Sequence, residues 1–169
     1  MSTNRLKTRV LVSLKGNLQQ DAMAQLKYGQ LVRALNKYVT LAGVFDVSLG
    51  GGSKISLALK TLHPVRREWR NRYTKHPQTF IQRSSRASKW ISQQDADAVV
   101  QIGALFNSRY SQEKIPSVIY TDYTSQLSAR HSEGNRSPYQ GAKLEEWLSL
   151  EKQSYAQAAH VCVRSKIVR

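Results

Sequence analysis

Hydrophobic residues follow two alternating spacings along the chain. Short aliphatic runs, the pattern of buried parallel strands, occur at residues 10–14, 41–49, 98–102, 117–120 and 160–163. Between them, apolar residues recur every three or four positions at 21–38, 62–73, 78–94 and 144–155, which predicts amphipathic helices. This alternation predicts an α/β fold with an open, mainly parallel Rossmann-like sheet and helices on both faces.

Several local signals mark where these elements begin and end. Asp21 is a candidate N-cap for the first helix, and Pro64 suits the first turn of the second. Gly50, Gly51 and Gly52 predict a flexible surface loop that ends the second strand. The loop after the first strand has only Gly16, so the dinucleotide-binding fingerprint GxGxxG is missing there.

The size and the single cysteine bound the organisation of the chain. With 169 residues, 40% of them hydrophobic, the sequence predicts one globular domain over residues 1–169. Cys162 is the only cysteine, so an internal disulfide is excluded, which favours a reducing, cytoplasmic location. We predict that Cys162 is a small buried residue. Histidines occur singly and no Cys/His cluster has zinc spacing, so we predict neither a metal site nor a cofactor.

Positive charge is concentrated in the middle of the chain. The formal net charge is +15, and the segment 54–89 holds ten Lys and Arg residues against one acid, Glu68. Such a patch fits an anionic membrane surface, reached through Arg66, Arg67 and Arg70, or the phosphates of a nucleic acid. The aromatic residues of this region lie on apolar helix stripes and are predicted to be core, which disfavours base stacking. A solvated basic face without a partner is the third reading.

Candidate site residues lie where strands end, because ligands of open parallel sheets bind at the carboxyl ends of strands. Three loops are predicted to converge there: residues 15–17, 103–106 and 121–124. In the last of these, Asp122 offers a carboxylate among hydroxyl groups that suits a hydroxyl-rich or phosphorylated ligand. The alternative is a turn in which Thr and Asp side chains cap backbone donors.

Longer stretches of the chain resemble a known family. HPVRREWRNRYTKHPQTFIQRSSRA, DAVVQIGALF, PSVIYTDYT and WLSLEKQSYAQAAHVCVRS are similar to the N-terminal half of bacterial glycosyltransferases of family four, which have the GT-B fold. The resemblance spans essentially the whole chain, and QIGALF and YTDYT are its more specific parts. It implies a domain that holds a sugar or lipid-linked acceptor, opposite a second domain that binds a nucleotide-sugar donor, and transfer with retention of configuration.

The resemblance also implies roles for individual residues. Gly16, flanked by Lys15 and Asn17, would approach the donor phosphates and the acceptor. Thr121 and Asp122 stand where many relatives have a His-Asp pair, so Asp122 is the candidate catalytic residue. The remaining predicted acceptor-side residues are Tyr123, Arg130 and His131. Glu146 and Glu151 match a late helix of the family and are predicted to be structural.

The pattern expected of the family's donor domain is not found in these 169 residues. Because retaining transfer needs groups that stabilise the departing nucleoside diphosphate, we expect this polypeptide alone to be inactive. Steady turnover of nucleotide sugars with candidate acceptors would contradict that expectation. The resemblance favours a cytoplasmic protein, peripheral at the inner membrane face. A basic nucleic-acid-binding module is the alternative function.

Overall fold

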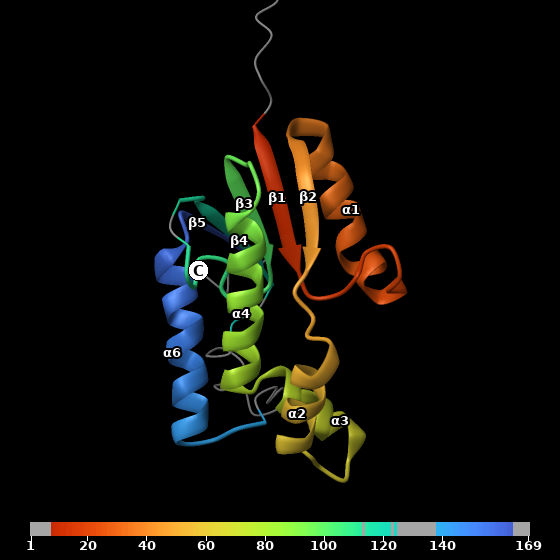
Figure 1. The fold of residues 1–169 in the computed structure, drawn as a ribbon, viewed down its shortest axis with the longest axis vertical. Helices are drawn as coiled ribbons and strands as arrows, with labels where there is room; N and C mark the ends of the chain where they lie inside the picture. Colours follow the sequence, from red (N-terminus) through yellow and green to blue (C-terminus); the bar gives the residue numbers. More distant parts are fainter. Residues whose placement is uncertain (1–7, 113, 123, 125–137, 164–169) are drawn as a thin grey trace, which may run out of the picture.

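The computed structural model describes residues 8–112, 114–122, 124 and 138–163, which form one parallel sheet with helices around it (Figure 1). The sheet has the order β2-β1-β3-β4-β5, and every neighbouring pair is parallel. Its strands are β1 Arg9–Leu14, β2 Thr40–Asp46, β3 Ala98–Ile102, β4 Ser117–Thr121 and β5 His160–Val163. The helices are α1 Ala22–Tyr38, α2 Gly51–Lys60, α3 Arg66–Thr74, α4 Pro77–Ser92 and α6 Ala142–Gln157. The predicted fold class is confirmed.

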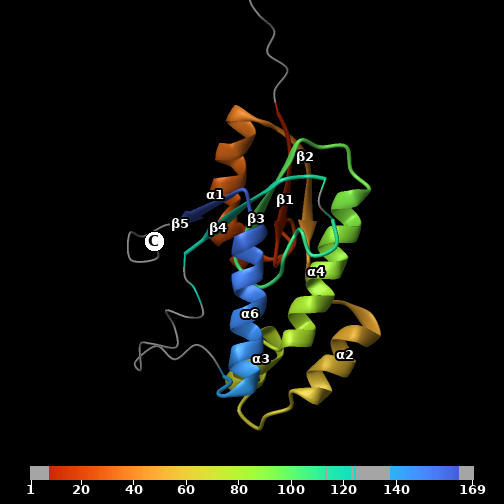
Figure 2. The ribbon, with the colours of Figure 1, turned by 90° about the vertical axis from the view of Figure 1, so that its left-hand side faces the viewer.

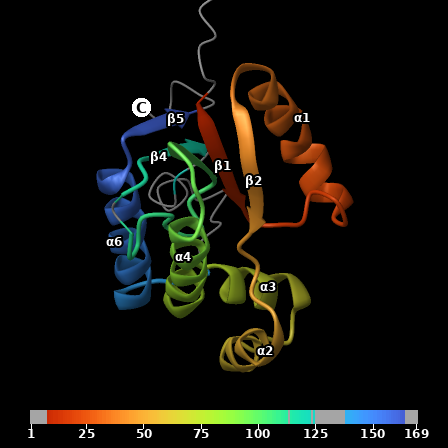
Figure 3. The same ribbon diagram turned by 45° about the horizontal axis from the view of Figure 1, so that its top comes forward.

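The helices cover both faces of the sheet. Helix α1 lies on one face, and α4 and α6 lie on the other (Figure 3). Successive residues of β1 serve the two faces, since Leu11 belongs to the core under α4 while Val12 and Leu14 belong to the core under α1. Helices α4 and α6 pack side by side (Figure 2), with the Phe80 and Trp147 rings edge to face at 5.4 Å between centroids.

Helix α1 begins where the sequence predicts. The Asp21 carboxylate accepts hydrogen bonds from the backbone N–H groups of Met23 and Ala24 at 2.9 and 3.2 Å. These two donors have no partner inside the helix, so the side chain satisfies both and fixes the first turn.

The end of the second strand differs from the prediction. Strand β2 stops at Asp46, three residues before the predicted end, because the Asp46 carboxylate accepts the Ser48 N–H at 2.8 Å and turns the chain. The three glycines are not a loop: Gly50 is the N-cap of α2, and the helix begins at Gly51. The buried Leu57 anchors this helix, which the sequence reading missed.

Two further predictions need correction. Helix α3 begins at Arg66, so Pro64 precedes the helix instead of occupying its first turn. Cys162 is exposed, and so is His160, because β5 is paired on one side only and lies at an edge of the sheet.

Candidate functional site

The order of the strands places a crevice at the carboxyl ends of β1 and β3. From β1 the chain moves outward to β2, and then returns across the sheet to β3 on the other side of β1. Loops leaving β1 and β3 therefore diverge to opposite faces, which is where open α/β sheets bind ligands. Helices α2 and α3 lie beyond this edge of the sheet (Figure 1).

Gly16 makes the turn out of β1. Its φ is +118°, and a Cβ atom there would lie 2.8 Å from the Ala24 Cβ. The Gly16 N–H donates to the Asp46 carboxylate at 2.8 Å, so the same side chain that ends β2 also fixes this loop. The backbone can thus pass close to the start of α1, as only glycine allows.

Asn17 has a structural part in this loop. Its side-chain oxygen accepts the N–H groups of Gln19 and Gln20 at 2.8 and 3.3 Å, and its carbonyl accepts the Asp21 N–H at 2.7 Å. A hollow of about 230 Å³ opens beside the loop, lined by Gly16, Asn17, Leu18, Gln19, Val44 and Asp46.

Lys15 forms a cationic cluster with Arg70 and Arg83 near the carboxyl end of β1. Its ammonium group lies 3.5 Å from the Thr74 hydroxyl of α3. Burial, together with the positive charges of Arg83 and Arg70, lowers the pKa of Lys15 from 10.5 to about 8. We therefore expect this cluster to favour an anionic group.

Arg83 is the most buried cation of this cluster, with 1% of its surface exposed. One guanidinium nitrogen donates to the Thr74 carbonyl at 3.0 Å, and the guanidinium stacks over the Tyr73 ring. Its Nε has no hydrogen-bond partner. Burial lowers the pKa of Arg83, which Tyr73 and the Asp46 carboxylate partly offset.

The loop after β3 is organised by the fully buried Gln101. The Gln101 amide nitrogen donates to the carbonyls of Gly103 and Phe106 at 2.9 and 2.7 Å, and its oxygen accepts the Ser108 N–H at 2.8 Å. Three bonds from one side chain hold residues 103–108 in place. Gly103 has a φ of +84° and no atom near its missing Cβ position, so the space beside its Cα is open, while its N–H donates to the Tyr120 carbonyl at 2.8 Å and its carbonyl accepts from Gln101.

Thr121 and Asp122, at the end of β4, differ in their exposure to solvent. Thr121 is buried, whereas Asp122 is exposed and faces a hollow of about 340 Å³ against α1. The lining residues are Leu26, Lys27, Tyr28, Gln30, Ile102, Gly103, Tyr120 and Asp122. Burial and the negative charge of Asp122 both raise the pKa of Tyr28. The phenol therefore stays protonated and can donate a hydrogen bond.

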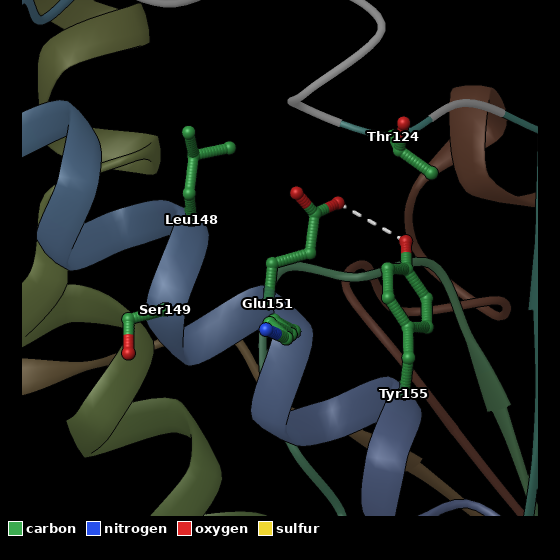
Figure 4. A pocket seen from close by; sticks show the side chains of 6 residues that line it. Thr124, Leu148, Ser149, Glu151 and Tyr155 are labelled. Atoms are coloured by element: carbon green, nitrogen blue, oxygen red, sulfur yellow. Dashed lines mark hydrogen bonds between the residues drawn. The ribbon is translucent and has the colours of Figure 1, made fainter.

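A second arrangement of polar groups lies on the other face, between β4 and α6 (Figure 4). The Tyr155 hydroxyl donates to the buried Glu151 carboxylate at 3.0 Å and also hydrogen-bonds the Thr121 side chain. Burial and the Glu151 charge raise the pKa of Tyr155 strongly. A hollow of about 630 Å³ beside the pair is lined by Thr124, Leu148, Ser149, Glu151, Lys152 and Tyr155. The helical spacing predicts that Glu151 and Tyr155 share one face of α6, whereas the burial of the carboxylate and its bond to the phenol come from the structure.

The structure brings the three predicted loops to the carboxyl-terminal end of the sheet, but the loops do not line a single hollow. Gly16 and Asn17 line one hollow, Asp122 lines another with Gly103, and Lys15 lies toward α3. Tyr123, Arg130 and His131 lie outside the described residues.

Three important groups were missed by sequence reasoning. Asp46 was counted as part of a longer strand, Arg83 as one of many surface cations, and Tyr28 as part of an apolar helix face. For Asp46, the only available signal was an acid at the end of an apolar run.

Two searches bear on the kind of site. Within the described residues, no group of three or more His, Cys, Asp or Glu side chains is placed to hold a metal ion. In that same part of the chain, no helix has the length and apolar character needed to cross a membrane.

Comparisons of the chain with protein-family models, with curated proteins and with solved structures find no match.

Proposed function

We propose that this chain is the acceptor-binding half-domain of a retaining glycosyltransferase that uses a nucleotide-sugar donor. The glycosyltransferase assignment comes from the resemblance of the sequence. The observation that supports the acceptor role is the hollow at the ends of β3 and β4, which Tyr28, Gln30 and Asp122 line together with Gly103, whose missing side chain leaves space beside its Cα.

The chemistry of this hollow suits the hydroxyl groups of a saccharide. Two phenols, one amide and one carboxylate provide both donors and acceptors, and they come from α1, β4 and the turn after β4. Its volume of about 340 Å³ is that of a small-molecule site. Asp122 would accept the proton of the attacking acceptor hydroxyl or orient that hydroxyl toward the donor.

The cationic cluster at the end of β1 complements this arrangement. Lys15 and the nearby Arg70 and Arg83 would attract the phosphates of a donor presented from the facing side of the crevice. The donor itself, in this proposal, is held by a second domain.

Binding by nuclear magnetic resonance tests the proposal. The probes are methyl glycosides of glucose, galactose, mannose and N-acetylglucosamine, with UDP-glucose and GDP-mannose as donor probes. We expect a glycoside to shift the amide signals of Gly103, Tyr120 and Asp122, and Asp122→Asn or Tyr28→Phe to weaken its binding about tenfold.

The matched control is Asp95→Asn, which removes an exposed carboxylate. Asp95 pairs with Arg9 at the opposite, amino-terminal end of the strands. This variant should bind as the wild type does. The proposal fails if no glycoside shifts these amides, or if a nucleotide sugar alone occupies the hollow.

A further inference from the structure

Helix α2 and the connection that joins it to α3 carry a concentration of exposed aliphatic side chains. Ten large apolar side chains are exposed among the described residues, and four of them lie within the segment 55–65. They are Ile55, Leu59, Leu62 and Val65, each with 55 to 62% of its surface exposed. Helix α3 buries none of its residues. Apolar groups gathered in this way mark an interaction surface.

The same segment is strongly basic. Residues 51–75 contain seven Lys and Arg side chains and a single acid, Glu68. Helices α2 and α3 project from one end of the molecule (Figures 1 and 3). The basic residues and the exposed aliphatic residues therefore belong to the same projecting segment of the chain. We call residues 51–75 the α2–α3 surface.

A hollow between the two helices adds a binding site to this surface. It measures about 350 Å³ and is lined by Lys54, Ala58, Arg66, Trp69, Arg70 and Tyr73. The Trp69 indole N–H donates to the Ala58 carbonyl at 2.8 Å, which fixes α3 against α2. Three cations and two aromatic rings, with no carboxylate in the lining, suit a phosphate-bearing group.

We propose that the α2–α3 surface docks on an anionic lipid bilayer. A phosphate of a lipid headgroup enters the hollow, while Ile55, Leu59, Leu62 and Val65 enter the interfacial layer. The proposal rests on the geometry of α2 and α3 and holds whether or not the acceptor role is correct.

The aliphatic side chains decide between a membrane and other polyanions. A nucleic acid offers phosphates to Lys54 and Arg66 but leaves Ile55 and Leu59 in water, and free phosphate does the same. Of these three partners, only a bilayer presents anionic groups and an apolar layer at the same surface. Trp69 and Tyr73 are half-buried against neighbouring elements, so they offer less face for stacking bases.

Vesicle sedimentation tests the proposal with the whole chain. Vesicles of phosphatidylcholine alone are compared with vesicles containing 30% phosphatidylglycerol, at about 0.1 M salt, where opposite charges still attract across the interface. Two double variants divide the surface into its apolar and charged parts: Ile55→Ser/Leu59→Ser and Lys54→Ser/Arg66→Ser. We expect binding only to the anionic vesicles, weakened on the order of tenfold by the apolar variant and roughly 30-fold by the charge variant.

Matched controls remove the same kinds of side chain from α1. They are Met23→Ser/Tyr38→Ser and Arg33→Ser/Lys37→Ser, all at exposed positions. Both controls should bind vesicles within about twofold of the wild type. Circular dichroism and urea unfolding show whether each variant is folded, and a variant that fails is replaced by the single substitution Ile55→Ser or Lys54→Ser.

Competing partners are measured in parallel with inorganic phosphate and with duplex DNA and single-stranded RNA. The proposal is overturned if vesicles do not bind, if the apolar variant binds them as the wild type does, or if the α1 controls lose as much. Tight, steeply salt-dependent nucleic-acid binding that the apolar variant retains would assign the surface to nucleic acid instead.

Discussion

Lys15 offers the sharpest quantitative test of the cationic cluster. Its ammonium group is half-buried at the end of β1, hydrogen-bonded to Thr74 and close to Arg70 and Arg83. The protein therefore holds a charged group where burial and like charges both oppose it. Replacing Lys15 with Met keeps most of the volume of the side chain and removes the charge.

The pKa of Lys15 sets the magnitude of the free-energy cost of keeping its charge in the folded protein. A fall from 10.5 to about 8 means that the folded state disfavours the charged form, by about 3 kcal/mol at pH 7. Between the two pKa values the unfolded chain binds more protons than the folded chain, so the stability of the wild type rises with pH there. At pH 9.5 only about 1.4 kcal/mol of the destabilisation remains.

Urea unfolding at pH 7 and pH 9.5 measures this effect. We expect Lys15→Met to be more stable than the wild type by about 3 kcal/mol at pH 7, and the difference to shrink by about 2 kcal/mol at pH 9.5. Changes in packing around the methionine contribute equally at both pH values. The change in the difference therefore reports the titration of Lys15.

The control is Lys89→Met, which removes one positive charge from an exposed position on α4. The reasoning is refuted if Lys15→Met shows the same difference from the wild type at both pH values, or if it is less stable at pH 7 than at pH 9.5 relative to the wild type. Either result would mean that the Lys15 ammonium is solvated and that the cluster does not concentrate positive charge.

Three further predictions concern side chains that hold the strand-end loops, each measured as the free energy of unfolding in urea. Gly16→Ala should cost about 3 kcal/mol, since it forces a positive φ and a contact with Ala24; a cost below about 0.5 kcal/mol would contradict the close approach. Gln101→Leu should cost about 3 kcal/mol by leaving three backbone groups unpaired, two of them buried, and should raise amide exchange at residues 103–108. Tyr155→Phe should cost about 1 to 2 kcal/mol because it takes a donor from the buried Glu151 carboxylate. The double variant with Glu151→Gln should cost less than the two single changes together, and simple additivity would argue against coupling of the pair.

The regular elements were largely readable from the sequence. Short aliphatic runs and apolar residues at a period of 3.6 report which residues face the core, and that requirement is local to each strand or helix. The sequence therefore predicted the five strands, the Asp21 cap and the fold class. It failed at α2, because three consecutive glycines signal a loop by their own preferences, whereas the structure places Gly51 and Gly52 inside the helix that the buried Leu57 anchors.

The candidate site was predicted less completely. The rule for parallel sheets correctly predicted that the loops after β1, β3 and β4 lie at the same end of the sheet. It gave no indication that Asp46 would hold Gly16 or that Arg83 would lie buried near Lys15. The partners in each of these two pairs come from different elements, whereas Glu151 and Tyr155 lie on one helix face at a spacing that the sequence shows.

The sequence by itself determined the five strands, every described helix except α2, the parallel pairing of the strands and the concentration of positive charge in one segment. These follow from spacing and composition, which need no knowledge of distant contacts. Tertiary structure alone decided which cations are buried under the sheet, which aliphatic side chains stay exposed on the α2–α3 surface, and which hollow each polar residue lines. Burial and electrostatic interaction depend on distance in space, and residues far apart in the chain become neighbours only when the sheet has formed.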